Sequence, residues 1–296
     1  SQSRDYKTFF MHLLGPAWVL YEFTYIITIV LILSVIGSAA GILLSDMLNT
    51  PPLIGTIFLI ATIGFLTFFG TALIEKVLAS WSVLLYVVYI SFLIMGFMKF
   101  GGPIKESLSI PADNTKWVGD GIKYASYNLA VIPTILFCLR HINSRQEAVI
   151  GGLLGGVLAI LPGILFYLVL VGFYPEIINE AVPINFILAA MGIPFFQLIF
   201  QIVIFGTFIE TGTALLHALN ERISITYEEK SLLMPVYLRP TVAVFTMLIA
   251  VFVSDRIGLI DLIAKGYVLL TYLFLSIFII PLFTIGLYKI IKVYSN

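Results

Sequence analysis

The chain has 296 residues, of which 60% are hydrophobic and only 11% are charged, and its mean hydropathy is +1.08. A soluble globular domain carries about 25% charged residues, so this composition excludes a soluble fold, a disordered chain and a nucleic-acid binder with a broad basic face. Lys and Arg equal Asp and Glu at 16 each, and the single cysteine, Cys138, excludes an intrachain disulfide. We therefore expect an all-α polytopic membrane protein whose main partner is the lipid bilayer.

Eight segments of the sequence are long and apolar enough to cross a bilayer core of roughly 30 Å, which takes about 20 helical residues. Turn or breaker residues separate them, such as Gly101-Gly102-Pro103 and Tyr174-Pro175. In chain order the expected spans are 14–44, 52–71, 73–100, 120–140, 147–174, 183–217, 238–254 and 259–291. The connections are short, so we expect a single transmembrane domain over residues 1–296, with 101–119 as its largest extracellular loop.

The first and sixth spans exceed a simple crossing, at about 31 and 35 residues or roughly 46 and 52 Å of helix. Such lengths imply tilt, protrusion or a break, and Gly192-Ile193-Pro194 is the expected place for a kink in the sixth span.

The placement of basic residues predicts the orientation. Six Lys and Arg residues fall on the side opposite residue 1, and the other ten fall on the same side as residue 1. By the positive-inside rule, both termini are expected in the cytoplasm. The six are Lys99, Lys105, Lys116, Lys123, Arg256 and Lys265.

Two carboxylates fall within expected spans. Glu22 lies in the first span, and Glu210 lies in the sixth, within Gly206-Thr207-Phe208-Ile209-Glu210-Thr211. A carboxylate at the centre of an isolated span would cost about 2.5–3.5 kcal/mol on insertion scales. Both are therefore expected to face the bundle interior, a water-filled cavity or each other. They could carry protons or bind a cation, or they could hydrogen-bond to neighbouring helices or reach the interface.

Residues 120–140 form the most unusual span. A polar cluster of Ser126, Tyr127 and Asn128 precedes Pro133 by one to two turns. Proline removes a helical hydrogen bond, and freed backbone at membrane depth is tolerated only when it is buried or lines a cavity. An interruption around 127–133 would present carbonyls, the Asn128 side chain and a half-helix end to a ligand. An ordinary proline kink with satisfied polar groups is the alternative.

Small and aromatic residues predict packing and interfacial positions. Gly37–Gly41 and the Gly151-Gly152-x-x-Gly155-Gly156 run are expected to permit close helix packing. Trp18, Tyr21, Tyr25, Trp81 and Trp117 are expected mostly at the membrane interface.

Enzymatic motifs are not recognisable in the sequence. Glu210, His217 and Glu221 share a helical face and could form a metal site or proton relay, but the interfacial end of a helix is the favoured interpretation. No nucleophile–base constellation is visible, so we predict neither an enzyme nor a resident metal or cofactor.

Three stretches resemble the YkvI-like family of bacterial membrane proteins. They are Phe9-Phe10 through Gly15-Pro16-Ala17-Trp18 with the following Tyr-Glu, then Gly64-Phe65-Leu66-Thr67-Phe68-Phe69-Gly70, and Tyr124-x-x-Tyr127-Asn128 running into Arg145-x-Glu147-Ala148-x-x-Gly151-Gly152. This family is similar to the amino acid–polyamine–organocation superfamily, whose LeuT-type core has ten helices in two inverted repeats.

The resemblance implies that the eight spans correspond to helices 3–10 of such a core, in a bacterial inner membrane. The polar cluster at 126–128 with Pro133 would then contact substrate. Thr207, Glu210 and Thr211, with Glu22, would serve ion or proton coupling. The first two helices of the core would be absent from this chain, which removes part of any substrate or ion site.

The leading functional hypothesis is a secondary active transporter, or an N-terminally incomplete form of one. It would move a small solute such as an amino acid by alternating access, with Na⁺ or H⁺ as the coupling ion. The alternatives are a membrane scaffold or assembly subunit without transport, and a channel. No nucleic-acid partner is expected, and the sequence assigns no substrate identity or oligomeric state.

Overall fold

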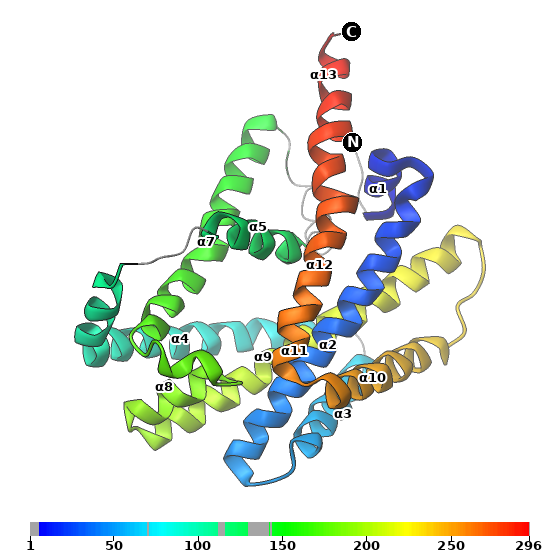
Figure 1. The fold of residues 1–296 in the computed structure, drawn as a ribbon. Coiled ribbons are helices and arrows are strands. Elements are labelled where there is room, and N and C mark those ends of the chain that lie inside the picture. Colours follow the sequence, from blue (N-terminus) through cyan, green and yellow to red (C-terminus); the bar gives the residue numbers. More distant parts are fainter. Residues whose placement is uncertain (1–5, 70, 112–115, 130–141, 143, 296) are drawn as a thin grey trace. The chain divides into compact units, whose positions relative to one another are not determined.

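The computed structural model describes residues 6–69, 71–111, 116–129, 142 and 144–295 (Figure 1). The elements found there are helical, and none of these described residues lies in a β-strand. In chain order they are α1 (Tyr6–Leu14), η1 (Gly15–Ala17), α2 (Trp18–Leu48), α3 (Pro52–Phe69), α4 (Thr71–Ser109), α5 (Trp117–Asn128), α7 (Arg145–Val171), η4 (Glu176–Asn179), α8 (Pro183–Met191), α9 (Pro194–Glu229), α10 (Leu238–Ile257), α11 (Leu259–Asp261), η5 (Leu262–Gly266), α12 (Tyr267–Phe274), η6 (Leu275–Ile279), η7 (Leu282–Gly286) and α13 (Leu287–Ser295).

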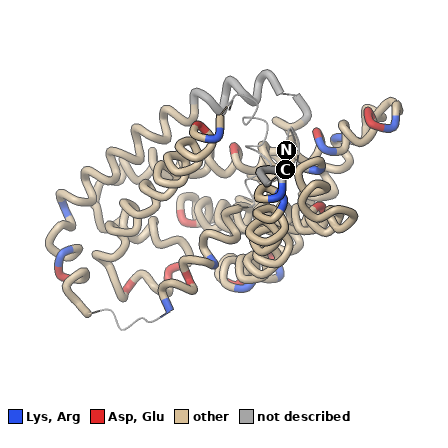
Figure 2. The backbone as a smooth tube through the Cα atoms, turned by 90° about the horizontal axis from the view of Figure 1, so that it is seen from above, with Lys and Arg blue, Asp and Glu red and all other residues tan. Residues whose placement is uncertain are grey.

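Within the described part of the chain, six helical stretches are long and apolar enough to cross a membrane. They are Lys7–Leu48, Trp81–Ser109, Arg145–Val171, Pro194–Glu229, Leu238–Ile257 and Leu259–Lys292, and Pro52–Thr67 is a shorter apolar helix. Charged residues are sparse along the backbone and separated by long uncharged stretches (Figure 2). The protein is therefore an all-α, membrane-embedded protein.

The predicted kink in the sixth span is confirmed as a break between two helices. Gly192 has φ +69°, in the left-handed region that favours glycine, and its N–H bonds to the Ala189 carbonyl at 3.0 Å. Pro194 then opens α9, where its fixed φ suits the first helical turn.

The predicted end of the third span at Gly101-Gly102-Pro103 is wrong. Helix α4 continues through Pro103 to Ser109, so the expected loop 101–119 is helical over its first part. Phe100 and Ile104 are both buried on either side of the glycines, and this packing outweighs the weak helix propensity of Gly and Pro.

The final apolar span departs from a regular α-helix in ways that its sequence pattern does not predict. Three π-helical segments, η5, η6 and η7, interrupt the regular helix between Leu262 and Gly286. At Gly266, a Cβ would lie 2.5 Å from Leu31 Cδ1, so this glycine permits a close approach to α2.

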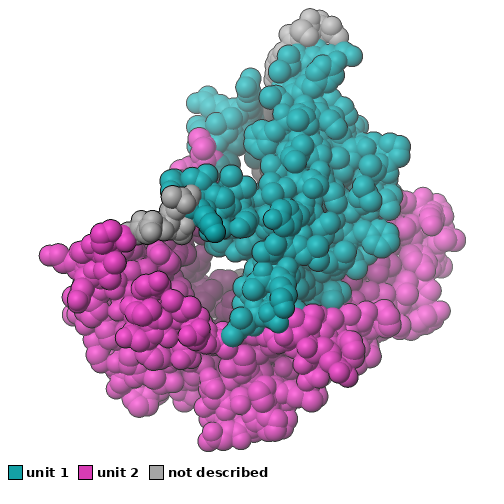
Figure 3. All heavy atoms as spheres, viewed as in Figure 1, with its two compact units in different colours: residues 1–31, 114–152, 260–296 teal, residues 32–113, 153–259 magenta. Residues whose placement is uncertain are grey.

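The chain forms two compact units (Figure 3). Unit 1 comprises residues 1–31, 114–152 and 260–296, and unit 2 comprises residues 32–113 and 153–259. Each unit has its own core.

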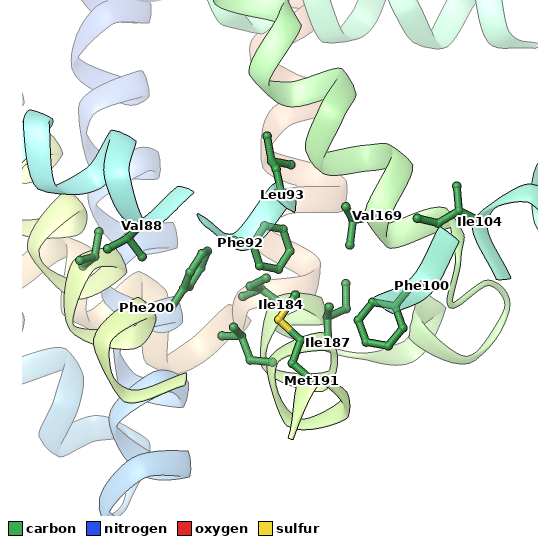
Figure 4. Packing of buried hydrophobic residues seen from close by; sticks show 12 residues of the cluster. Val88, Phe92, Leu93, Phe100, Ile104, Val169, Ile184, Ile187, Met191 and Phe200 are labelled. Carbon is green, nitrogen blue, oxygen red and sulfur yellow. The ribbon is translucent and has the colours of Figure 1, made fainter. Parts of the chain in front are cut away.

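The core of unit 2 is an apolar cluster supplied by α4, α7, α8 and α9 (Figure 4). Phe92 and Ile187 are fully buried at its centre, and the Phe92 ring lies 5.1 Å from the Phe200 ring. Phe100 meets Phe173 edge-to-face at 4.6 Å. These contacts hold both sides of the α8–α9 break against α4.

Helices α2 and α3 of unit 2 pack closely through small residues, as the Gly37–Gly41 run predicts. A Cβ on Gly41 would lie 2.5 Å from the Pro52 carbonyl oxygen, and one on Gly55 would lie 2.9 Å from that of Ala40. The Thr56 hydroxyl donates to the Gly37 carbonyl at 2.8 Å.

The packing expected of Gly151–Gly156 is not observed, because a Cβ on any of its four glycines meets no described atom within 4 Å.

The core of unit 1 is aromatic. Tyr21 of α2 is stacked on Phe10 of α1 with ring centroids 3.5 Å apart, and it meets Phe274 of α12 edge-to-face at 6.2 Å. Tyr21 and Tyr25 are 1% and 2% exposed, so the expectation that they lie at the membrane interface is wrong. Residues 6–14 form helix α1, whose Phe10 ring packs against Tyr21. This helix covers a tyrosine ring that α2 alone would leave exposed.

Candidate functional site

The polar cluster predicted in residues 126–128 lies in unit 1, at the end of α5 and against α12. Ser126 is fully buried, and its hydroxyl donates to the Ile122 carbonyl at 2.6 Å. The exposed Asn128 amide donates to the Tyr124 carbonyl at 2.7 Å, which leaves its side-chain oxygen as an acceptor. Both side chains therefore satisfy their own helix while Asn128 retains capacity for a ligand.

Tyr127 is held by aromatic contacts. Its ring stacks on Tyr267 of α12 at 4.7 Å between centroids, with 27° between planes, and it meets Tyr124 edge-to-face at 5.4 Å. The Thr271 hydroxyl of α12 donates to the Lys123 carbonyl of α5 at 3.2 Å. Aromatic rings arranged in this way can pack against a flat or cationic part of a small molecule.

The interruption expected around 127–133 stays a prediction. Helix α5 ends at Asn128, and the N–H of Leu129 bonds to the carbonyls of Ser126 and Tyr127. Pro133 and Cys138 lie outside the described residues.

The predicted coupling residues of α9 lie together in unit 2. Thr207, Glu210 and Thr211 are spaced i, i+3 and i+4, so their side chains share one helical face. Thr207 donates its hydroxyl proton to the Val203 carbonyl, and Thr211 donates to that of Thr207, each at 2.9 Å. Both threonine oxygens therefore have only lone pairs to offer beside the half-buried Glu210 carboxylate.

Further along α9, about one and three turns beyond Glu210, two polar side chains are buried without a hydrogen-bond partner among the described residues. Thr213 is fully buried and Asn220 is 4% exposed, and neither the Thr213 hydroxyl nor the Asn220 side-chain oxygen meets a partner among the described residues. Such groups are rare in folded proteins and mark sites where water or an ion is expected. Neither residue could be predicted from the sequence, because an Asn or Thr on a long helix carries no local signal of burial.

The other predicted site residues lie elsewhere. Glu22 is half-buried on α2 in unit 1, next to the buried Tyr21. Glu221 forms an ion pair with Arg239 at 3.0 Å, which satisfies the carboxylate that the metal interpretation would have used. Among the residues the structure describes, no group of three or more His, Cys, Asp and Glu side chains is placed to hold a metal ion.

Tyr267 and Thr271 are further members of the unit 1 cluster that the sequence analysis missed. They lie about 140 residues from α5 in sequence, and only the packing of α12 on α5 brings them together.

No model of a known protein family matches the chain, and neither a curated protein nor a solved structure is similar to it.

Proposed function

We propose that this protein is a secondary active transporter of a small solute, such as an amino acid or a related organic compound. Na⁺ or H⁺ would drive transport by alternating access, in a LeuT-type arrangement in which the eight expected spans correspond to helices 3–10. The protein would lie in a bacterial inner membrane with both termini in the cytoplasm. The resemblance of the Gly64–Gly70 and Tyr124–Gly152 stretches to YkvI-like proteins supports this assignment.

The observation that carries the proposal is the Glu210 group on α9. A carboxylate in a membrane-crossing helix is costly and is retained chiefly where it binds an ion, relays a proton or pairs with another group. Here the hydroxyl oxygens of Thr207 and Thr211 lie on the same face of the helix, and each already donates its proton to a backbone carbonyl. A carboxylate and neutral oxygens form a suitable ligand set for Na⁺, and the carboxylate alone suffices to carry a proton.

The α5–α12 cluster supplies the proposed substrate contacts. Tyr127 would pack against the substrate, and the free Asn128 oxygen would accept a hydrogen bond from it. Replacing Tyr127 with Phe keeps the stacking on Tyr267, whereas Tyr127→Leu removes it. We expect KM to rise about fivefold in Tyr127→Leu and to change little in Tyr127→Phe, because stacking contributes about 1 kcal/mol.

The test is uptake into proteoliposomes across a panel of radiolabelled amino acids, with an imposed Na⁺ or proton gradient. Glu210→Gln removes the charge at nearly constant volume and is expected to abolish gradient-driven accumulation. Glu22→Gln tests the second predicted coupling residue. Glu106→Gln is the matched control, because Glu106 is an exposed residue near the end of α4.

Uptake that is unchanged in Glu210→Gln would contradict the proposed role of Glu210 in coupling. Single-channel currents through the purified protein would contradict a carrier mechanism. Thermal unfolding of each variant separates a loss of coupling from a loss of folding.

A further inference from the structure

We infer that unit 2 carries a second cation site, distinct from Glu210, in a small polar pocket formed by α2, α3 and α10. The pocket has a volume of about 140 Å³. It is lined by Ser38, Pro52, Leu53, Thr56, Ser254 and Asp255. The inference goes beyond the proposed function, because it concerns binding at residues that no step of transport uses.

The helices that form this pocket are fixed to one another. Thr56 of α3 bonds to the Gly37 carbonyl of α2 at 2.8 Å. On α3, Gly64 admits the Met247 side chain of α10, whose Cε would lie 2.9 Å from an added Cβ. All the lining residues belong to unit 2, so the pocket does not depend on how the two units are arranged.

The ligand chemistry of the pocket favours a cation. Asp255 contributes a carboxylate that forms no ion pair with any residue the structure describes, and the neighbouring Arg256 is stacked over the Phe252 ring at 5.5 Å. The Thr56 hydroxyl has donated its proton to Gly37, so it presents lone pairs only. Ser38 and Ser254 add two further hydroxyl oxygens.

The helix dipoles at the pocket, taken together, also favour a cation. Ser254 and Asp255 lie in the last turn of α10, where the partial negative charge of the helix favours cations. The opening turn of α3 meets the same pocket and would favour anions. However, its first residue is Pro52, which has no N–H, and the N–H of Ile54 already bonds to the Pro51 carbonyl at 3.0 Å.

Charge and size select a singly charged ion. A single carboxylate balances one positive charge, whereas Ca²⁺ takes six to eight oxygens that include several carboxylates. A volume of about 140 Å³ corresponds to roughly four or five water molecules. The pocket therefore suits an alkali cation with part of its hydration shell, or a primary ammonium group.

The test is thermal unfolding of the purified 296-residue chain in nanodiscs, followed by tryptophan fluorescence. Sodium, potassium or methylammonium chloride is compared with N-methyl-D-glucamine chloride at equal ionic strength. Binding to the folded state is expected to raise Tm by roughly 2–5 °C at saturation. Comparison of the alkali salts with methylammonium identifies which kind of singly charged cation is bound.

The titrations are made in a Glu210→Gln background, which removes any contribution of the proposed coupling site, and there Asp255→Asn is expected to abolish the rise in Tm. Ser254→Ala and Ser38→Ala are expected to weaken it, and they keep the inference testable if Asp255→Asn fails to fold. Asp261→Asn is the matched control, because Asp261 forms an exposed pair with Lys265 at 3.0 Å, and it should retain the full rise. Glu210→Gln alone should still show a rise, which separates this site from the proposed coupling site.

A rise in Tm that persists when Asp255→Asn is combined with Glu210→Gln would overturn the inference, as would the absence of a rise with every monovalent salt in the Glu210→Gln background. A larger rise with calcium than with sodium at equal ionic strength would contradict the assignment to a singly charged cation. None of these outcomes bears on uptake, so failure here leaves the transport proposal to its own test.

Discussion

Gly206 of α9 is a position where only a hydrogen atom fits. A Cβ there would lie 1.9 Å from Cζ2 and 2.1 Å from Cε2 of Trp81, whose indole N–H donates to the Val203 carbonyl at 3.3 Å. Trp81 is thus half-buried against α9, and its expected place at the membrane interface stays a prediction. We predict that Gly206→Ala lowers the free energy of unfolding by about 1–3 kcal/mol through overpacking, measured as chemical or thermal unfolding in detergent.

Two further variants show whether the contact itself is responsible. Gly155→Ala of α7 makes the same change where a Cβ meets no described atom within 4 Å, and it should be neutral or stabilising. Trp81→Phe shortens the side chain and should recover part of the loss in the double variant. An equal effect of Gly206→Ala in both backgrounds would exclude the steric explanation.

The α8–α9 break is a feature of elements rather than of single contacts. Lys99 of α4 donates to the Met191 carbonyl at 2.6 Å and so caps the exposed end of α8, while Gly192 turns the chain with φ +69°. Gly192→Ala is predicted to cost about 1 kcal/mol, because a Cβ is disfavoured in the left-handed region. The control is Gly101→Ala, because Gly101 is helical and its added Cβ would meet no described atom within 4 Å. Both variants are compared by thermal unfolding. A smaller loss at Gly192 than at Gly101 would contradict this account.

The sequence predicted helices correctly where a long apolar stretch marks them. It failed where packing between residues far apart in the sequence determines where a helix ends. The span 238–254 corresponds to α10 at Leu238–Ile257, and the Gly192–Pro194 signal marked a real break. The predicted end of the third span at residue 100 is wrong, because Phe100 and Ile104 both pack in the unit 2 core and α4 continues past Pro103. The π-helical segments η5 and η7, which end at Gly266 and Gly286, have no periodic signature in the sequence.

At the scale of the whole molecule, the candidate site residues could be predicted only one at a time. Ser126, Asn128 and Glu210 stand out in sequence because polar groups are costly in lipid. Tyr267 could not be found in this way, since an aromatic residue in an apolar span is ordinary until its ring is seen stacked on Tyr127. Asp255 directly follows the predicted span 238–254, and only the packing of α3 and α10 places it in a pocket.

The orientation of the whole chain in the membrane follows from its basic residues and can be tested directly. Ten of the 16 Lys and Arg residues were assigned to the side of residue 1, which predicts that the α9–α10 connection is cytoplasmic and the end of α4 is external. Both places offer exposed positions, since Leu233 is 96% and Ile110 is 60% exposed. In a Cys138→Ser background, Ile110→Cys should react with a membrane-impermeant maleimide in intact cells. Leu233→Cys should react only after permeabilisation, and the reverse pattern would invert the predicted topology.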